Sequence, residues 1–224
     1  MKYNRNFFKN IRLIRYLYYQ FKEYYPLLRP IRGSANLIKN KGIKIKTKII
    51  IEGNNNTILI GEGVVLKHVK IIIKGNNHLL SINRDSFISG TVLWFEDDRC
   101  VINIGERTFI GPTHIAVTED DSQIKIGSDS MISSHVEIRT GDSHSIINND
   151  TLKRINYAKN VQIGDHVWIA SDVKIMKGVV IEKDTIISAG SIVTKSFPAN
   201  VLIGGVPAQI IKENVTWDKS RIKS

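Results

Sequence analysis

Aliphatic residues recur along this chain at fixed intervals, and the interval changes once. Four isoleucines follow one another at spacings of 22 residues: Ile60, Ile82, Ile104 and Ile126. Each lies in a short segment of alternating apolar and polar residues that follows a polar, turn-prone cluster. After residue 160 the interval falls to six, and an aliphatic residue occupies every sixth position from Ile163 to Val193. Neither interval suits a helix, and β-branched Ile and Val dominate both patterns.

This pattern predicts an all-β solenoid of stacked coils. Three six-residue faces make a coil of about 18 residues, and each coil buries its inward aliphatic residues against the next. The 22-residue repeats are then the same coil with one corner four residues longer. The clusters GNNN (53–56) and EDDS (119–122) mark that longer corner.

The two ends of the chain follow other patterns. Apolar residues spaced by three and four positions between Phe7 and Tyr25 predict an amphipathic helix, which Pro26 and Pro30 end. Two interpretations of this basic, aromatic helix remain open: it caps the solenoid or packs between subunits, or it rests on a membrane. We therefore predict an N-terminal helix over 1–32, a solenoid over 33–212 with a loop at 142–160, and a polar tail over 213–224, either a short helix or frayed.

Composition narrows the possible partners and location. The net charge is +11, but Lys and Arg are dispersed and no nucleic-acid-binding motif is present, so an anionic substrate or a membrane surface is expected instead of a nucleic acid. No apolar stretch is long enough to span a bilayer, and the first residues do not form a secretory signal. The lone Cys100 can form no intramolecular disulfide. We expect a cytoplasmic protein, with peripheral contact at the inner face of the membrane if the helix binds lipid.

The repeats resemble those of the hexapeptide-repeat acyltransferases over residues 50–212. Segment 163–212, which begins IGDHVWIAS, resembles the C-terminal acyltransferase module, although Ala170 stands where that family usually has Gly. Segment 113–146, which ends RTGDSHSI, resembles the branch that O-acetylates bacterial capsular and cell-surface polysaccharides. The resemblance implies a left-handed parallel β-helix, acetyl-CoA as co-substrate, a carbohydrate acceptor, and a homotrimer whose adjacent subunits share each site.

One histidine is a candidate general base. Acetyl transfer to a sugar hydroxyl requires removal of the hydroxyl proton, and imidazole, with an ordinary pKa of about 6.5, suits that task at neutral pH. His144 interrupts the aliphatic repeat and opens the loop, and Asp142 points to the same side of an extended segment. A His in this DSH motif resembles the catalytic base of the polysaccharide O-acetyltransferases. We predict His144 as the base and Asp142 as its orienting group; the alternatives are a loop histidine held by local hydrogen bonds and a turn aspartate.

The other histidines are expected to be structural or exposed. His68 and His78 are predicted at the surface, and His135 and His166 occupy turn positions. His114 falls at an inward or corner position, where it either shapes the acceptor site or has a purely structural role. The spacings among His114, His135 and His144 do not place them at one position of successive coils, so we predict no metal site.

The expected acetyl-CoA site lies further along the chain. Trp168 is predicted to face outward; the resemblance places such a Trp beside the acetyl group or acceptor at the subunit junction, and the alternative is burial against a neighbouring subunit. Three small residues would let the pantetheine arm approach the backbone: Ser188, Ala189 and Gly190. Lys195 and Lys212 are candidates for the phosphates, or else solvated surface residues.

These observations predict an acetyl-CoA-dependent O-acetyltransferase that acts on a sugar hydroxyl of a bacterial surface polysaccharide or its precursor. N-acetylation of an amino sugar or small molecule on the same fold is an alternative. A non-enzymatic β-solenoid scaffold is a further alternative, but a scaffold would not need the loop that carries His144.

Overall fold

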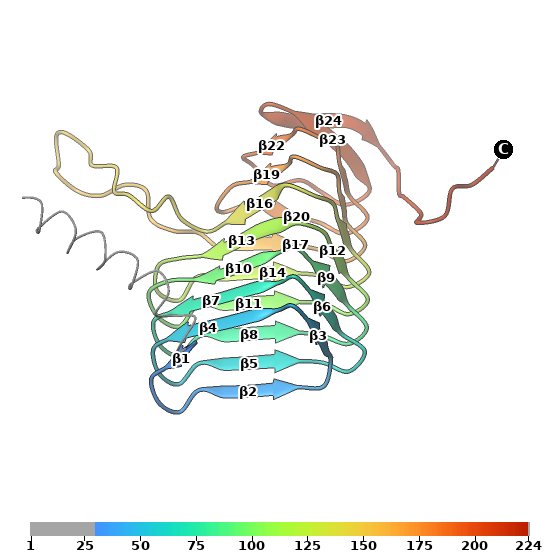
Figure 1. Ribbon diagram of the computed structural model, residues 1–224. Coiled ribbons are helices and arrows are strands. Elements are labelled where there is room, and N and C mark those ends of the chain that lie inside the picture. The colour runs from blue at the N-terminus through green and yellow to red at the C-terminus, as the bar shows by residue number, and fades with distance from the viewer. Residues whose placement is uncertain (1–29, 224) are drawn as a thin grey trace, which may run out of the picture.

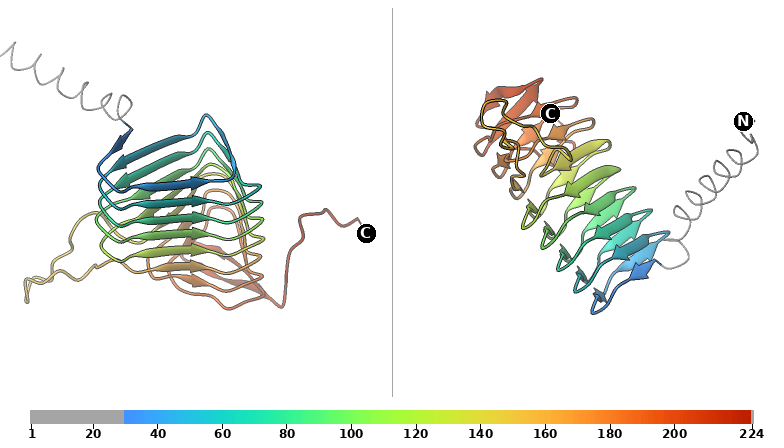
Figure 2. Two further views of the ribbon diagram at one scale, coloured as in Figure 1. Left: turned by 90° about the horizontal axis from the view of Figure 1, so that it is seen from below. Right: turned by 90° about the vertical axis from the view of Figure 1, so that its left-hand side faces the viewer.

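Each coil of the chain contributes one strand to each of three sheets, and the sheets form the three faces of a solenoid (Figure 1). The computed structural model describes residues 30–223, so residues 1–29 of the predicted N-terminal helix lie outside the described residues, and the end of that range, Ile31–Arg32, is the first strand of the solenoid instead of helix. Viewed along its axis, the solenoid has a triangular outline, with the loop after β16 projecting on one side (Figure 2). The described part is all β, and no helix long and apolar enough to cross a membrane occurs in it.

The three sheets are named A, B and C. Sheet A contains β1 (Ile31–Arg32), β4 (Lys48–Glu52), β7 (Lys70–Lys74), β10 (Val92–Phe95), β13 (Thr113–Val117), β16 (Val136–Arg139), β19 (Lys174–Ile175) and β22 (Ile192–Val193). Sheet B contains β2 (Leu37–Asn40), β5 (Thr57–Ile60), β8 (Leu79–Ile82), β11 (Val101–Ile104), β14 (Gln123–Ile126), β17 (Val161–Ile163) and β20 (Val180–Ile181). Sheet C contains β3 (Ile43–Ile45), β6 (Val65–Lys67), β9 (Phe87–Ser89), β12 (Phe109–Ile110), β15 (Met131–Ile132), β18 (Trp168–Ile169), β21 (Ile186–Ile187), β23 (Val201–Gly205) and β24 (Ala208–Glu213).

Strand pairing confirms the predicted coil lengths. Ile58 pairs with Leu80, and Ile102 pairs with Ile124, each 22 residues apart, whereas Gln162 pairs with Val180 after 18 residues. The additional residues lie at the corner between sheets A and B, where 53–56 join β4 to β5. Inward residues form columns of fully buried aliphatic side chains, and each such burial contributes about 1.5–3 kcal/mol. The core is therefore continuous along the solenoid.

Polar side chains stabilise the long A–B corner. The Asn76 side-chain oxygen accepts the Asn54 N–H at 2.9 Å, and that of Asp98 accepts the Asn76 N–H at 2.7 Å. One position in each corner points inward, which makes the predicted surface location of His78 wrong. His78 is 1% exposed, and its Nδ1 accepts the backbone N–H of Cys100 at 3.1 Å. Burial lowers the pKa of His78 below its ordinary value.

The C-terminal end is closed by a hairpin. β24 runs antiparallel to β23 and covers the last edge of sheet C. Residues 214–223 follow as an irregular tail without a helix. Trp217 nevertheless lies 7% exposed in this polar tail, and its Nε1 donates to the His166 carbonyl oxygen at 2.7 Å. The tail therefore packs on the outer face of sheet C.

Candidate active site

The predicted loop occupies residues 140–160, between β16 and β17, and extends the A–B corner away from the solenoid (Figure 1). His144 lies at its base and is exposed. Its backbone carbonyl oxygen accepts a hydrogen bond from Asn156 Nδ2 at 2.7 Å. This bond fixes the backbone that carries the imidazole, while the ring remains accessible to solvent.

Asn156 joins the two chain segments that form the base of the loop. It is 7% exposed, and its Nδ2 also donates to Asp142 Oδ2 at 2.8 Å, while its Oδ1 accepts the Ile146 N–H at 2.7 Å. Its own backbone oxygen accepts a hydrogen bond from Lys177 Nζ at 2.9 Å. A buried amide with this many partners holds one loop conformation, because any opening would leave several polar groups without partners.

The Asp142 carboxylate bonds to Lys177 and Asn156. Lys177 lies between β19 and β20, at the A–B corner of the following coil, and donates from Nζ to Asp142 Oδ2. This hydrogen bond is the main cause that lowers the pKa of Asp142, so the group is a carboxylate at neutral pH. The predicted role of Asp142 in orienting the His144 ring remains a prediction.

A cavity of about 250 Å³ adjoins the loop base on the outer face of sheet A. It is lined by Trp94, Glu96, His114, Ala116, Thr118, Arg139, Gly141 and Ser143. Trp94, Ala116 and Arg139 lie side by side on consecutive strands. The small Ala116 side chain between two large neighbours leaves the hollow. Ser143, one of the lining residues, directly precedes His144 in the chain, so the cavity adjoins the segment that carries His144.

His114 lies on the outer face of sheet A, between Val92 and Glu137 on the flanking strands. The inward or corner position expected from the sequence is therefore wrong, because the inward residue of β13 is Ile115, which is fully buried. His114 does line the cavity. Partial burial, together with the charge of Arg139, lowers its pKa, so its ring is neutral at neutral pH.

Three buried side-chain polar atoms of the described residues have no hydrogen-bond partner: Thr118 Oγ1, Arg139 Nε and Trp168 Nε1. Buried polar atoms are normally paired, so each such exception calls for an explanation. Thr118 and Arg139 line the cavity. Trp168 is a predicted site residue. The unpaired atoms thus belong to residues of the two candidate regions of the site.

Trp168 lies on the outer face of sheet C, as the sequence predicts, between the buried Val167 and Ile169. Trp217 of the tail packs on it, with ring centroids 6.0 Å apart, and stacks on His166 at 4.5 Å. His166 Nδ1 lies 2.9 Å from Asp184 Oδ1. The tail and the coil together form an aromatic cluster around Trp168.

The small residues Ser188, Ala189 and Gly190 lie at the corner between β21 of sheet C and β22 of sheet A. Ala189 and Gly190 are exposed, and a Cβ added to Gly190 would have no atom within 4 Å. This open backbone fits a narrow chain such as pantetheine. Lys212 is exposed on β24. The Lys195 Nζ donates to Gln209 Oε1 at 2.7 Å.

The predicted site residues therefore form two groups on different sides of the solenoid. Asp142, His144 and the cavity lie at or beside the A–B corner, whereas Trp168 lies on sheet C, the face opposite that corner (Figures 1 and 2). A single chain does not bring His144 and Trp168 together.

No group of three or more His, Cys, Asp or Glu residues within 30–223 could hold a metal ion. His135 is exposed, with Nδ1 3.4 Å from Asp172 Oδ1. Burial raises the pKa of Cys100 to about 12, so its thiol is protonated and enclosed at neutral pH.

Sequence reasoning missed several residues at the site: Trp94, Arg139, Asn156, Lys177 and Trp217. Two of these residues have a sequence feature that could have identified them. Trp94 is an aromatic residue at an outward strand position, and Trp217 is the lone aromatic of a polar tail. Nothing in the local sequence separates Asn156 or Lys177 from other loop Asn and surface Lys residues.

Comparison with known proteins places these features in a family. Residues 160–195 match the model described as bacterial transferase hexapeptide (six repeats). The crystal structure of the polysialic acid O-acetyltransferase OatWY superposes with a TM-score of 0.82 at 34% identity, covering 86% of this chain and 94% of that chain. The chain belongs to the hexapeptide-repeat transferase family.

Two further similarities lie in the same branch of the hexapeptide-repeat transferases. The polySia-specific acetyltransferase NeuO superposes with a TM-score of 0.77 at 35% identity, covering 85% of this chain and 81% of that chain. The polysialic acid O-acetyltransferase of Escherichia coli O1:K1 / APEC is 44% identical over 92 residues, which are 41% of this chain and 30% of that relative. The aligned segment thus spans less than a third of the length of this curated relative.

Proposed function

We propose that this chain is an acetyl-CoA-dependent O-acetyltransferase that acts on a sugar hydroxyl of a bacterial surface polysaccharide or its precursor. The observation that carries the proposal is the match to OatWY over 94% of that chain. The relatives cited above are named as O-acetyltransferases or polySia acetyltransferases, which favours O-acetylation over N-acetylation. The left-handed winding implied by the resemblance is part of the proposal.

His144 is the proposed general base. Its ring is exposed next to Ser143, which lines the cavity on sheet A, so an acceptor sugar in that cavity would present a hydroxyl near the imidazole. His144 would take the hydroxyl proton as the sugar oxygen attacks the thioester carbonyl carbon, a role that contributes about 10²–10⁴ in rate. The C–S bond would then break, and coenzyme A would leave as the thiol after the imidazolium returns the proton to its sulfur. A backbone N–H would stabilise the oxyanion. Transfer would be direct, since the lone thiol, Cys100, is buried and protonated.

The region around Trp168 on the outer face of sheet C would hold acetyl-CoA, which supplies the acetyl group as a thioester. Three observations fit it: the unpaired Trp168 Nε1 is a hydrogen-bond donor without an acceptor, the backbone at Gly190 is open, and Lys212 is exposed for a phosphate. Ser188 and Ala189 precede Gly190 at the same corner, and Lys195 follows β22. The lone Cys100 and the use of acetyl-CoA fit a cytoplasmic location.

We further propose a homotrimer in which the A–B corner of one subunit meets sheet C of the next. The outward column of sheet C is apolar throughout: Ile43, Val65, Phe87, Phe109, Met131, Trp168, Ile186 and Leu202. Apolar side chains are also exposed along the loop: Ile146, Ile147, Leu152, Ile155 and Tyr157. Apolar surfaces of this kind mark interfaces between subunits. Such a trimer would unite His144 with the neighbouring subunit's copy of Trp168.

The test is direct acetyl transfer. The purified full chain is incubated with isotopically labelled acetyl-CoA and bacterial surface polysaccharides, and NMR locates the label. The expected product carries an O-acetyl ester on a sugar carbon. Label on nitrogen would favour the N-acetyltransferase alternative, and label that remains on coenzyme A with every glycan supplied would reject the proposal.

A further inference from the structure

Charged residues one coil apart carry opposite signs over much of the solenoid. Arg84 Nε lies 2.9 Å from Glu106 Oε2, Arg99 Nε 2.7 Å from Asp121 Oδ1, and Arg107 Nε 2.7 Å from Asp129 Oδ1. Neighbouring strands of a sheet are about 4.8 Å apart, so stacked like charges repel and stacked opposite charges attract. The chain thus pairs charges along its coils in these columns.

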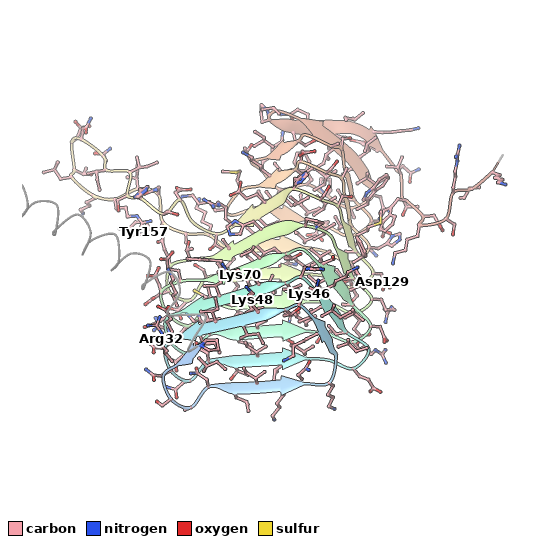
Figure 3. All side chains as sticks on the ribbon, in the orientation of Figure 1. Arg32, Lys46, Lys48, Lys70, Asp129 and Tyr157 are labelled. Atoms are coloured by element: carbon pink, nitrogen blue, oxygen red, sulfur yellow. The ribbon has the colours of Figure 1, made fainter. Side chains whose placement is uncertain are left out.

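On sheet A, a column of like charges lacks such ion pairs. Lys48 on β4 and Lys70 on β7 are strand neighbours in register, and Lys46 lies at the corner that precedes β4 (Figure 3). We call these three exposed lysines the basic surface. Between residues 31 and 75 there are nine Lys and Arg residues but two acids, Glu52 and Glu62. Glu52 pairs with Arg32, and Glu62 follows β5 of sheet B at another corner.

Among the described residues, no carboxylate forms an ion pair, within 4.0 Å, with any lysine of the basic surface. A column of unneutralised like charges costs folding free energy that the ion-paired columns avoid. An external anion that binds across these lysines would remove the repulsion. The feature therefore indicates a binding surface for negative charge.

The same column leads to the cavity. Lys48 pairs in register with Lys70, Lys70 with Val92, and Val92 with His114, which lines the cavity beside Ser143. Two strand spacings, about 10 Å, therefore separate Lys70 from His114 along the axis. An extended chain that places one unit in the cavity can lie along sheet A and reach the basic surface with units further along.

We propose that Lys46, Lys48 and Lys70 bind the acidic groups of a polyanionic polysaccharide whose reacting sugar occupies the cavity. The proposal rests on the proposed acetyl transfer and specifies its acceptor as an anionic polymer. Lys48 and Lys70 share a column with His114 of the cavity, and Lys46 lies beside that column at the corner before β4. This alignment with the cavity fits an extended polymer better than a membrane, which presents its charges over a broad plane. The attraction would also speed encounter with the polymer and weaken with salt.

The experiment compares wild type with the triple variant Lys46→Gln/Lys48→Gln/Lys70→Gln. The control variant, Lys39→Gln/Lys125→Gln/Lys183→Gln, loses the same charge from exposed positions on or beside sheet B. Binding of fluorescent polysialic acid is measured by anisotropy at low and high NaCl, with a neutral dextran of equal length as a second probe. KM and kcat are measured with polysialic acid and with a short sialic acid oligomer.

The triple variant should bind polysialic acid roughly 3- to 100-fold more weakly and with a smaller salt dependence, because each exposed charge pair contributes modestly. KM for the polymer should rise while kcat and the KM for the short oligomer stay unchanged, and the control variant should behave as wild type. Equal losses in both variants, wild-type affinity in the triple variant, or equally strong binding of dextran would overturn the proposal.

Three further outcomes separate failure of the docking surface from failure of the proposed function. Binding of phosphatidylserine vesicles through the three lysines, without polysialic acid binding, would replace the polymer with a membrane and overturn the proposal. Lysine-dependent polymer binding without acetyl transfer would support the docking surface and reject the proposed enzymatic function. Acetyl transfer that is unaffected by the triple substitution would support the proposed enzymatic function and reject the docking surface.

Discussion

His144 and Trp168 lie on different sides of the solenoid: His144 follows β16 at the A–B corner, and Trp168 begins β18 on sheet C, the face opposite that corner. If both act in one reaction, they must come from different subunits. A mixture of His144→Ala and Trp168→Ala chains, each inactive alone, should therefore regain activity when trimers are reassembled together. Roughly one intact site per mixed trimer is expected from cyclic symmetry. No recovery in mixed trimers verified by mass spectrometry would contradict the shared site.

The His144→Ala variant should lose about 10²- to 10⁴-fold in kcat, because the proposed general base is removed. Binding of acetyl-CoA, measured by calorimetry, should persist, since the base does not hold the coenzyme. The matched control is His68→Asn, an exposed histidine in an early turn at φ 55°, a conformation that Asn tolerates. Near-wild-type turnover in the His144→Ala enzyme would remove it as the base.

The Asn156→Ala variant should lower kcat by about 100-fold and leave the KM for acetyl-CoA unchanged. The loss of its bonds to Asp142 and to the His144 carbonyl frees the loop base, and small displacements of a catalytic group cost this much. Trypsin should also cleave faster after Lys153 and Arg154. In the control, Asn148→Ala, the lost bonds are those to Asp150 and Thr151 at the loop tip, so kcat should change little. Rapid cleavage with unchanged kcat would show that the hydrogen bonds of Asn156 do not position His144.

The Phe109→Lys variant should dissociate the trimer, because it places a charge in the apolar column of sheet C. Phe109 is 40% exposed and stacks on Phe87 with ring centroids 5.6 Å apart. Sedimentation velocity should show monomers, and acetyl transfer should fall with them. Asn103→Lys, on the outer face of sheet B, is the control and should remain trimeric. A trimer of Phe109→Lys chains would place the interface elsewhere.

Stability should depend on pH through His78. Burial lowers its folded-state pKa below the ordinary value of about 6.5, so the unfolded chain binds the proton more readily. This contribution is fully present above pH of about 6.5 and is lost as the pH falls through the folded pKa, where the Cys100 N–H also loses its acceptor. The urea midpoint of wild type should drop more between pH 7 and 5.5 than that of His78→Asn. Asn is a suitable replacement because Asn56 occupies the equivalent position one coil earlier, where its Oδ1 accepts the backbone N–H of His78. Parallel pH profiles would contradict the assignment.

The sequence by itself determined the coil lengths, the inward columns and the position of the long corner. Contacts in a solenoid join each residue to its counterpart one coil away, so Ile58 meets Leu80 wherever the period holds. It also drew attention to His144, because that residue breaks the period. The aliphatic pattern therefore determines how neighbouring coils stack on one another.

Tertiary structure alone decided what happens where the period fails or where side chains turn. Lys177 reaches Asp142 across 35 residues, and Asn156 reaches the His144 carbonyl across the loop, contacts that no repeat predicts. His78 is buried because the corner turns its side chain inward, and Lys48 shares a column with His114 because the strands align in register. Periodicity specifies which residues stack within the coils, but the path of the loop and the direction of each corner side chain depend on packing and hydrogen bonds formed only in the folded chain.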